Sequence, residues 1–242
     1  MKKSFLLLLI FAAAFLLFTC LAVTVDRGSF TPQPAGEAAE ALAAGETAAE
    51  TVGQETAVGF SALNFRVQEK LGYRNSFYKA SKYLGYLAIL SGCALLAWTC
   101  LQALRRRSLF RVDSDLKAAS VMIVCLAVCY ILFEKLALNM RPVIIDLHEG
   151  LEASYPSTHT LLGCCLFGGA AVFVLRRFAG KPFAKPAAAL LVLCAAATVA
   201  CRLLSGVHWV TDILGGLLLS MALLSLTAAM LAKYPSRDTI PE

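Results

Sequence analysis

The chain has 242 residues, of which 59% are hydrophobic and only 16% are charged, and its mean hydropathy is +0.70. This composition excludes an ordinary soluble domain and indicates a polytopic membrane protein. The formal net charge of +6 comes from short basic runs beside apolar segments, which is typical of topology signals and argues against a nucleic-acid partner.

Six apolar stretches approach the roughly 20 residues that a helix needs to cross a bilayer core. They cover residues 5–23, 83–104, 118–133, 160–175, 187–201 and 213–232. The third and fourth stretches are short, but each extends into the polar residues that flank it. We therefore predict an all-α fold, a polytopic membrane bundle of six transmembrane helices.

These spans divide the chain into four parts. We predict a first transmembrane helix over residues 1–24, a long outer loop over 25–82, a five-helix membrane core over 83–233 and a cytoplasmic tail over 234–242. The first segment is interpreted as an uncleaved anchor, because its apolar core exceeds that of a usual signal peptide and no clear cleavage site follows. A cleaved signal peptide is the alternative. With the N-terminus inside, most basic residues beyond the long loop face the cytoplasm.

The long outer loop has two parts of different character. Residues 36–57 are rich in Ala, Glu, Gly and Thr and carry almost no large apolar side chain, so we predict a low-complexity segment that does not order itself. Residues 60–78 mix aromatic and aliphatic side chains with polar ones. We predict that this second part lies on the membrane surface and leads into the second helix.

Cysteines and aromatic residues near the spans are assigned structural roles. All nine cysteines fall in or at the ends of apolar stretches, so they are expected to be buried small hydrophobic residues that form neither disulfides nor a metal site. Tyr155 and Trp209 lie at the ends of spans. We predict that both belong to an aromatic belt at headgroup depth.

Polar residues from three separate segments are predicted to gather at the outer rim. The end of the third span and the loop after it contribute Lys135 and Arg141. The start of the fourth span contributes residues 155–159, and the link between the fifth and sixth contributes residues 202–212. Two of the three histidines lie in these last two segments. This convergence on one membrane face predicts a functional site.

The order and spacing of these residues resemble the signature of the type-2 phosphatidic acid phosphatase superfamily. The family pattern is Lys, six residues, Arg-Pro; then Pro-Ser-Gly-His; then Ser-Arg, five residues, His, three residues, Asp. The resemblance implies that His208 is the nucleophile, Asp212 its orienting partner and His159 the general acid. It also implies a set of phosphate binders, namely Arg202, Arg141, Ser157, Lys135 and, at the glycine position, Thr158.

The chemistry of phosphomonoester cleavage asks for the same residue types. A dianionic phosphoryl group needs fixed cationic donors, a nucleophile in line with the leaving oxygen, and an acid for that oxygen. Arg202 and Arg141 carry fork-shaped donors. His208 and Asp212 are four residues apart, so on a helix they share a face and the carboxylate holds one ring nitrogen protonated. Residues 156–159 open a helix, whose N-terminus favours an anion.

Three positions depart from the family pattern. Five residues, not six, separate Lys135 from Arg141, so the lysine position holds Glu134. A phosphate role for Lys135 and a snorkelling or Glu134-paired role therefore both stay open. Thr158 stands at the glycine position and Cys201 at the serine position. None of these changes touches the nucleophile, its partner or the acid, so activity is expected.

The predicted function is hydrolysis of a lipid phosphate or diphosphate through a phosphohistidine intermediate, without a metal or other cofactor. The predicted location is the cell membrane, with multi-pass topology and the active site on the outer face. The family suggests undecaprenyl diphosphate, phosphatidylglycerol phosphate, phosphatidic acid and diacylglycerol pyrophosphate as substrates, and the sequence does not choose among them. The alternatives are a lipid phosphotransferase and a non-catalytic protein that binds lipid phosphates. The sequence leaves the oligomeric state open.

Overall fold

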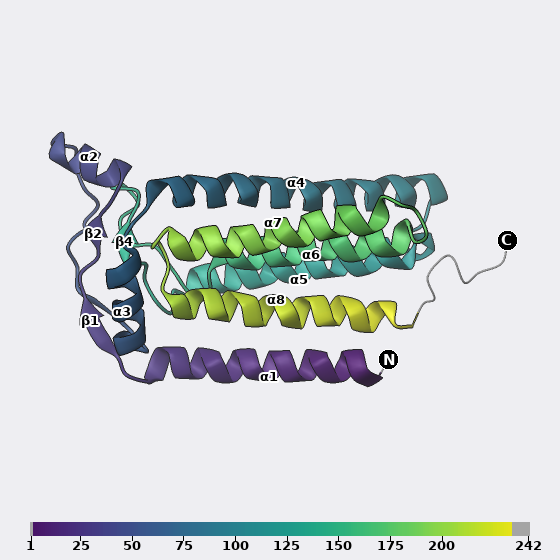
Figure 1. Cartoon of the computed structure of the whole chain (residues 1–242), viewed down its shortest axis with the longest axis horizontal. Coiled ribbons are helices and arrows are strands. Elements are labelled where there is room, and N and C mark those ends of the chain that lie inside the picture. Colours follow the sequence, from purple (N-terminus) through teal and green to yellow (C-terminus); the bar gives the residue numbers. More distant parts are fainter. Residues whose placement is uncertain (1, 234–242) are drawn as a thin grey trace.

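Six long helices run side by side along the axis of the molecule (Figure 1). The structure is a computed structural model that describes residues 2–233, so the predicted tail over 234–242 lies outside the described residues. Each long helix is long and apolar enough to cross a membrane, which confirms the predicted all-α bundle of six transmembrane helices. They are α1 (Lys2–Thr24), α4 (Asn75–Arg106), α5 (Ser114–Leu136), α6 (Thr158–Arg177), α7 (Ala184–Leu204) and α8 (Val210–Leu231).

The helices begin earlier than their apolar stretches, and α4 shows the largest difference. It begins at Asn75, so residues 75–82 belong to a helix and not to the predicted outer loop. An apolar window marks only the part of a helix that lies in hydrocarbon. Lys79 and Lys82 are good helix formers and continue α4 beyond that part. This extension brings the end of α4 to the same height as the polar residues of the other helices.

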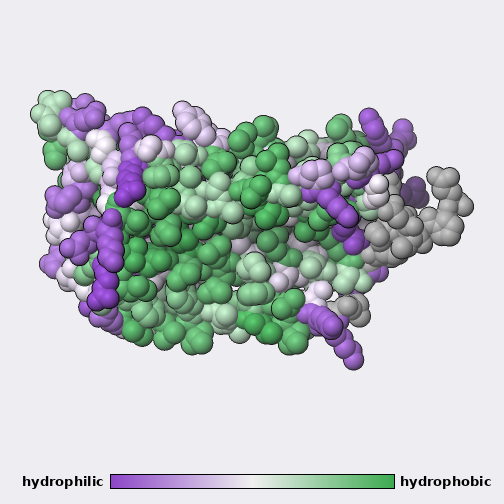
Figure 2. All heavy atoms as spheres, viewed as in Figure 1, coloured by the Kyte–Doolittle hydropathy of each residue, from purple (hydrophilic) through white to green (hydrophobic). Residues whose placement is uncertain are grey.

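The helix α6 forms the centre of the bundle. It packs against α4, α5, α7 and α8, whereas α1 packs mainly against α8 (Figure 1). The outward faces of the helices carry large apolar side chains; Leu16, Leu90 and Leu193 are examples that are well exposed. Figure 2 shows this surface as a continuous apolar band with hydrophilic residues at both ends. Such a surface is favourable in contact with lipid, which agrees with a multi-pass membrane protein.

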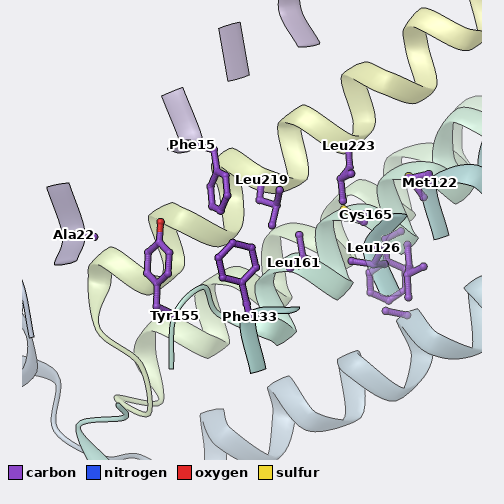
Figure 3. Packing of buried hydrophobic residues seen from close by; sticks show 13 residues of the cluster. Phe15, Ala22, Met122, Leu126, Phe133, Tyr155, Leu161, Cys165, Leu219 and Leu223 are labelled. Atoms are coloured by element: carbon purple, nitrogen blue, oxygen red, sulfur yellow. The ribbon is translucent and has the colours of Figure 1, made fainter. Parts of the chain in front are cut away.

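Aromatic rings join α1, α5 and the segment before α6 (Figure 3). The ring centroids of Phe15 and Phe133 are 5.6 Å apart in an edge-on arrangement, and Tyr155 stacks on Phe15 at 6.4 Å. The hydroxyl of Tyr155 lies 2.7 Å from Oγ1 of Thr19. Gly215 permits this approach, since a Cβ there would lie 2.6 Å from the Tyr155 ring. The assignment of Tyr155 to an aromatic belt is therefore wrong, because the ring is buried among helices.

A small domain that we call the cap, residues 25–74, lies across one end of the bundle (Figure 1). Its strands β1 (Gly28–Phe30) and β3 (Thr56–Val58) pair antiparallel. Strand β2 (Gln33–Pro34) pairs in parallel with β4 (Val143–Ile144) from the loop before α6. The helices of the cap are α2 (Glu37–Ala43) and α3 (Ser61–Leu71), and one turn of 3₁₀ helix, η1 (Leu109–Arg111), lies beside the opposite end of α4.

The structure differs from the prediction that residues 36–57 do not order themselves. Ala38 packs in a small apolar cluster with Ile144 and Leu147. The backbone N–H of Ala49 donates to the carbonyl of Leu147 at 2.9 Å. The segment is ordered by apolar surface from a distant part of the chain, which its own composition does not reveal.

The helix α3 lies against the loop between α7 and α8, so residues 61–71 pack on protein, in contrast to the predicted membrane-surface segment. Phe65 and Phe30 pack against the ring of Trp209, with centroids 5.7 and 4.8 Å away. Trp209 is consequently buried, and its assignment to an aromatic belt is wrong. Buried Asn64 donates from Nδ2 to Oγ1 of Thr211 at 2.9 Å.

The same loop also contacts the backbone of the cap at Gly206. Gln68 of α3 donates from Nε2 to the Gly206 carbonyl at 2.9 Å. Gly206 has φ +68°, and a Cβ there would lie 1.9 Å from the carbonyl oxygen of Gly72. Only glycine therefore permits the cap to close on this loop.

We predict that Gly206→Ala lowers the melting temperature of the purified protein far more than Gly180→Ala does. Gly180 has a similar φ of +76° but nothing within 4 Å of a Cβ, so it serves as a matched control. Alanine at Gly180 costs only the left-handed conformation, about 1–2 kcal/mol. At Gly206 the clash adds to that cost, for a total of about 3 kcal/mol or more. Melting temperatures of both variants are measured in the same detergent. Equal decreases would contradict the contact between Gly206 and the cap.

Candidate active site

Backbone hydrogen bonds join the first of the three predicted segments to the residues just before the second. The N–H of Arg141 donates to the carbonyl of Glu152 at 3.1 Å, and the N–H of Ser154 donates to the carbonyl of Asn139 at 2.8 Å. Residues 139–141 and 152–154 therefore run antiparallel. This pairing fixes the height of Arg141 relative to Ser154 at the cap end of the bundle.

Two further hydrogen bonds join the third segment to the other two. The indole Nε1 of Trp209 donates to the carbonyl of Met140 at 2.8 Å. The N–H of Ser157 donates to the carbonyl of Asp212 at 3.0 Å. The structure thus brings together the three segments that the sequence analysis placed on one membrane face.

His208 lies in the short loop between α7 and α8, and its imidazole is almost completely buried. Its Nδ1 is 3.6 Å from Oδ2 of Asp212, which is too long for a hydrogen bond. Burial, together with the nearby charges of Arg202 and Arg141, lowers the pKa of His208 well below its usual range. The ring is therefore neutral at physiological pH.

Ser154 connects His208 to Asp212 and was missed by the sequence analysis. Its hydroxyl oxygen lies 3.0 Å from Nδ1 of His208, and its hydroxyl group donates a hydrogen bond to Oδ2 of Asp212. A serine hydroxyl has one proton to donate, so its oxygen accepts the proton of Nδ1. The proton of the neutral ring is then on Nδ1, and Nε2 carries a free lone pair. The serine precedes the second motif, and no spacing rule pointed to it.

Asp212 is held from several directions at the start of α8. Its Oδ2 also accepts the backbone N–H of Trp209 at 2.9 Å, in a capping arrangement with the first turn of the helix. The carboxylate is fully buried. These bonds fix the orientation of the serine that in turn holds His208.

Two arginines approach the same region from different elements. Arg202, in the last turn of α7, is 1% exposed. Its Nη1 donates to Oγ of Ser81 at 3.3 Å, and its guanidinium carbon lies 5.5 Å from the ring centroid of Tyr78. Arg141 donates from Nη1 to Oε2 of Glu152 at 2.8 Å. Burial raises the pKa of Glu152, and the charge of Arg141 opposes that rise.

The second motif opens α6, where Ser157 is the N-cap residue. The Ser157 side chain makes no capping hydrogen bond, which leaves its hydroxyl available to a ligand. His159, in the first turn, lies against α4 at Gly85, where a Cβ would be 3.0 Å from Cδ2 of the imidazole. Gly85 thus allows α4 to pack directly on His159.

A cavity of about 610 Å³ opens beside these residues at the cap end. Arg141, Glu152, His159 and Arg202 line it, while His208 and Asp212 lie buried outside its lining. The helix α4 supplies a further part of the wall, made of Tyr78, Lys79, Lys82, Tyr83 and Tyr86. None of these α4 residues was predicted to belong to the site, because residues up to 82 were assigned to a loop and residues 83–104 to an apolar span.

Three predicted phosphate binders lie outside this cavity lining, and the first of them, Ser157, is fully buried. Lys135 is exposed near the end of α5, next to the exposed Glu134. Thr158 is half-buried in the first turn of α6. The cavity wall contains none of the three.

Several buried polar atoms of the site have no hydrogen-bond partner within residues 2–233. Buried polar groups in folded proteins are almost always paired, so such a concentration indicates a site for a polar ligand. Two of the atoms belong to guanidinium groups, and the ligand that these favour is an anion. The unpaired atoms include Nε of Arg141, Oγ of Ser157, Nδ1 of His159, Nε of Arg202, Nε2 of His208 and Oδ1 of Asp212. In the same described range, no group of three or more His, Cys, Asp or Glu residues is arranged to hold a metal ion.

Comparison with known proteins gives two matches. The model of the PAP2 superfamily matches residues 115–235. Among solved structures, the chain is similar to the first transmembrane PAP2 type phosphatidylglycerolphosphate phosphatase from Bacillus subtilis, with 20% sequence identity and a TM-score of 0.42. That match covers 73% of this chain and 96% of the other. No curated protein matches the sequence significantly.

We predict that inorganic phosphate binds the purified protein and raises its melting temperature, because it pairs the unpartnered donors. A ligand at about 100 times its Kd stabilises a protein by about 2.7 kcal/mol. Arg202→Met is expected to weaken phosphate binding at least about tenfold, since it removes a charge-assisted donor. Arg105→Met, at the opposite end of α4, is the control and is expected to bind phosphate normally. A phosphate titration of Arg202→Met that matches the parent protein would contradict an anion site here.

Proposed function

The chain belongs to the PAP2 superfamily, and from this premise we propose that it is an integral membrane lipid phosphatase that works through a phosphohistidine on His208. Membership of the superfamily supports phosphatase chemistry. The observation that carries the mechanism is the buried His208, whose Nε2 is unpaired. The charges of Arg202 and Arg141 act on its ring, and each of these arginines also has an unpaired guanidinium nitrogen. A nucleophile and cationic donors for a phosphoryl group are the parts that the reaction requires.

In the first step, Nε2 of His208 attacks phosphorus and forms a P–N bond. The bond between phosphorus and the lipid oxygen breaks, and its electron pair stays on that oxygen. His159 donates a proton to the leaving oxygen. Arg141 and Arg202 stabilise the negative charge on the other phosphoryl oxygens.

In the second step, water attacks the phosphohistidine. His159, now without its proton, accepts one from the water molecule as the oxygen bonds to phosphorus. The P–N bond breaks, its electron pair returns to Nε2 of His208, and inorganic phosphate leaves. Each catalytic group is then back in its starting state.

The protonation state of His208 is suited to its proposed role as the nucleophile. The lowered pKa keeps the imidazole neutral, and the proton on Nδ1 is held by Ser154. When the P–N bond forms, the ring becomes positively charged, and the buried carboxylate of Asp212 stabilises that charge through the serine hydroxyl. Ser154 is in this proposal a positioning residue that acts through His208.

The donor set supports a mechanism without a metal ion. The phosphoryl group is met by guanidinium and imidazole nitrogens, which already supply the positive charge that a metal would bring.

The distribution of basic residues supports an active site on the outer face of the cell membrane. Basic side chains concentrate at the end opposite the cap, where α4, α6 and α7 carry Arg105, Arg106, Arg176, Arg177 and Lys185. Such a concentration is typical of the cytoplasmic side. The cap end with its cavity then faces outward, and the lipid headgroup enters there while its tail stays among the helices.

We predict that the protein in detergent releases phosphate from at least one of four lipids, in the presence of a chelator. The panel consists of phosphatidic acid, diacylglycerol pyrophosphate, phosphatidylglycerol phosphate and undecaprenyl diphosphate. His208→Ala is expected to lower kcat by about 10³-fold or more, since it removes the nucleophile. His148→Ala replaces an exposed histidine near the cap and serves as the control with normal activity. Phosphate release that a chelator abolishes, or that survives in His208→Ala, would refute the proposed mechanism.

Ser154→Ala is predicted to lower kcat by about 10–100-fold and to leave KM almost unchanged. The serine orients His208 but does not line the cavity, so substrate binding does not depend on it. Steady-state kinetics on the lipid that the parent protein hydrolyses best measures both constants. Ser61→Ala, a buried serine of the cap, is the control for the loss of a hydroxyl. A rise in KM with unchanged kcat would contradict the positioning role.

A further inference from the structure

One face of α4 lies against the candidate site at four positions with helical spacing. Tyr78, Ser81, Lys82 and Gly85 follow one another at three, one and three residues, so they form a single stripe along the helix. Three of them touch known site residues. Tyr78 and Ser81 contact the guanidinium group of Arg202, and Gly85 packs on His159.

The remaining member of the stripe is a cation. Lys82 lies between Ser81 and Gly85 in height and lines the same cavity as Arg141, Arg202 and His159. Among the described residues it has no salt-bridge partner, whereas its neighbour Lys79 pairs with Glu37 at 3.3 Å. Acidic residues line this cavity too, but Glu37 pairs with Lys79 and Glu152 with Arg141. The unpaired ammonium group of Lys82, in a cavity that two guanidinium groups also line, is expected to attract an anion.

We propose that Lys82 of α4 binds the phosphoryl group of the substrate, as a third cationic donor beside Arg141 and Arg202. This inference rests on the proposed function for the identity of the substrate. The two arginines approach from the loop before β4 and from α7, so an ammonium group from α4 reaches the phosphoryl group from a side that neither covers. Lys135, the lysine nearest to the first motif, is exposed outside the cavity lining and leaves this side empty.

Lysine differs from arginine in what it contributes at this position. Its ammonium group is a compact charge on a flexible stem, whereas Arg202 is fixed by Ser81 and Tyr78. Lys82 is therefore suited to follow a phosphoryl group as it enters the cavity and to release phosphate afterwards. The fixed guanidinium groups define the position of the phosphoryl group during the reaction.

The test measures the Kd for inorganic phosphate and kcat/KM for the best lipid substrate in four variants of the full chain. Lys82→Met is expected to raise the Kd about tenfold and to lower kcat/KM about 10–100-fold, as for the loss of one charge-assisted donor. Lys82→Arg is expected to keep most of both values. Lys135→Met and the distant control Lys185→Met are expected to change either value less than about threefold.

Melting temperatures without phosphate identify a variant that has not folded, and Lys82→Arg then carries the test. Unchanged phosphate affinity in Lys82→Met would overturn the proposal. A loss of phosphate affinity in Lys135→Met alone would also overturn the proposal, because the lysine that binds phosphate would then belong to α5. Phosphate affinity does not depend on turnover, so the proposal on Lys82 and the proposed phosphatase function fail or succeed separately.

Discussion

The site depends on one constraint, which is that three polar chain segments at the end of a membrane bundle satisfy one another's backbone groups. Arg141 and Glu152 are joined through their backbones, as are Asn139 and Ser154, and the carbonyl of Asp212 accepts the N–H of Ser157. Backbone groups removed from water need such partners, because an unpaired one costs several kcal/mol in an apolar environment. The same bonds that satisfy the backbone set the height and direction of every side chain in the site. Catalytic geometry is in this way a consequence of backbone pairing.

The cap extends this constraint to the loop that carries His208. Trp209 is enclosed by Phe30 and Phe65, and Asn64 holds the start of α8 through Thr211. A short loop between two helices would otherwise be open to water and free to move. With the cap in place, His208 is buried and its pKa is lowered, which gives the neutral imidazole that the proposed mechanism requires. The segment between the first two membrane helices thus contributes to the chemistry without supplying a catalytic group.

Hydropathy and motif spacing predict the features that depend on local sequence. The six spans follow from the lengths of the apolar stretches, and the four-residue spacing brings His208 and Asp212 close together. Only Asp212 lies in α8, however, whereas His208 lies in the loop before it and contacts the carboxylate through Ser154. Hydropathy and motif spacing do not predict contacts between segments that are distant in the sequence. Ser154 joins a histidine and a carboxylate more than fifty residues away, and residues 36–57 are ordered by Leu147 from another loop. The start of α4 was missed because its polar first turns carry no apolar signal, although they line the cavity.

Glu152 is one of four acidic residues that, within the described part of the chain, line the cavity beside its cations, and its contact with Arg141 has an electrostatic explanation. Arg141 and Arg202 would repel each other in a buried site, and Glu152 offsets part of that repulsion through its contact with Arg141. The pair also fixes the guanidinium group before substrate arrives, while Nε of Arg141 keeps a free donor. Without this carboxylate, the site would bind both the phosphoryl group of the substrate and the phosphate product more tightly. Because binding that is equal in ground and transition states does not raise kcat, partial neutralisation by Glu152 favours turnover over retention of phosphate.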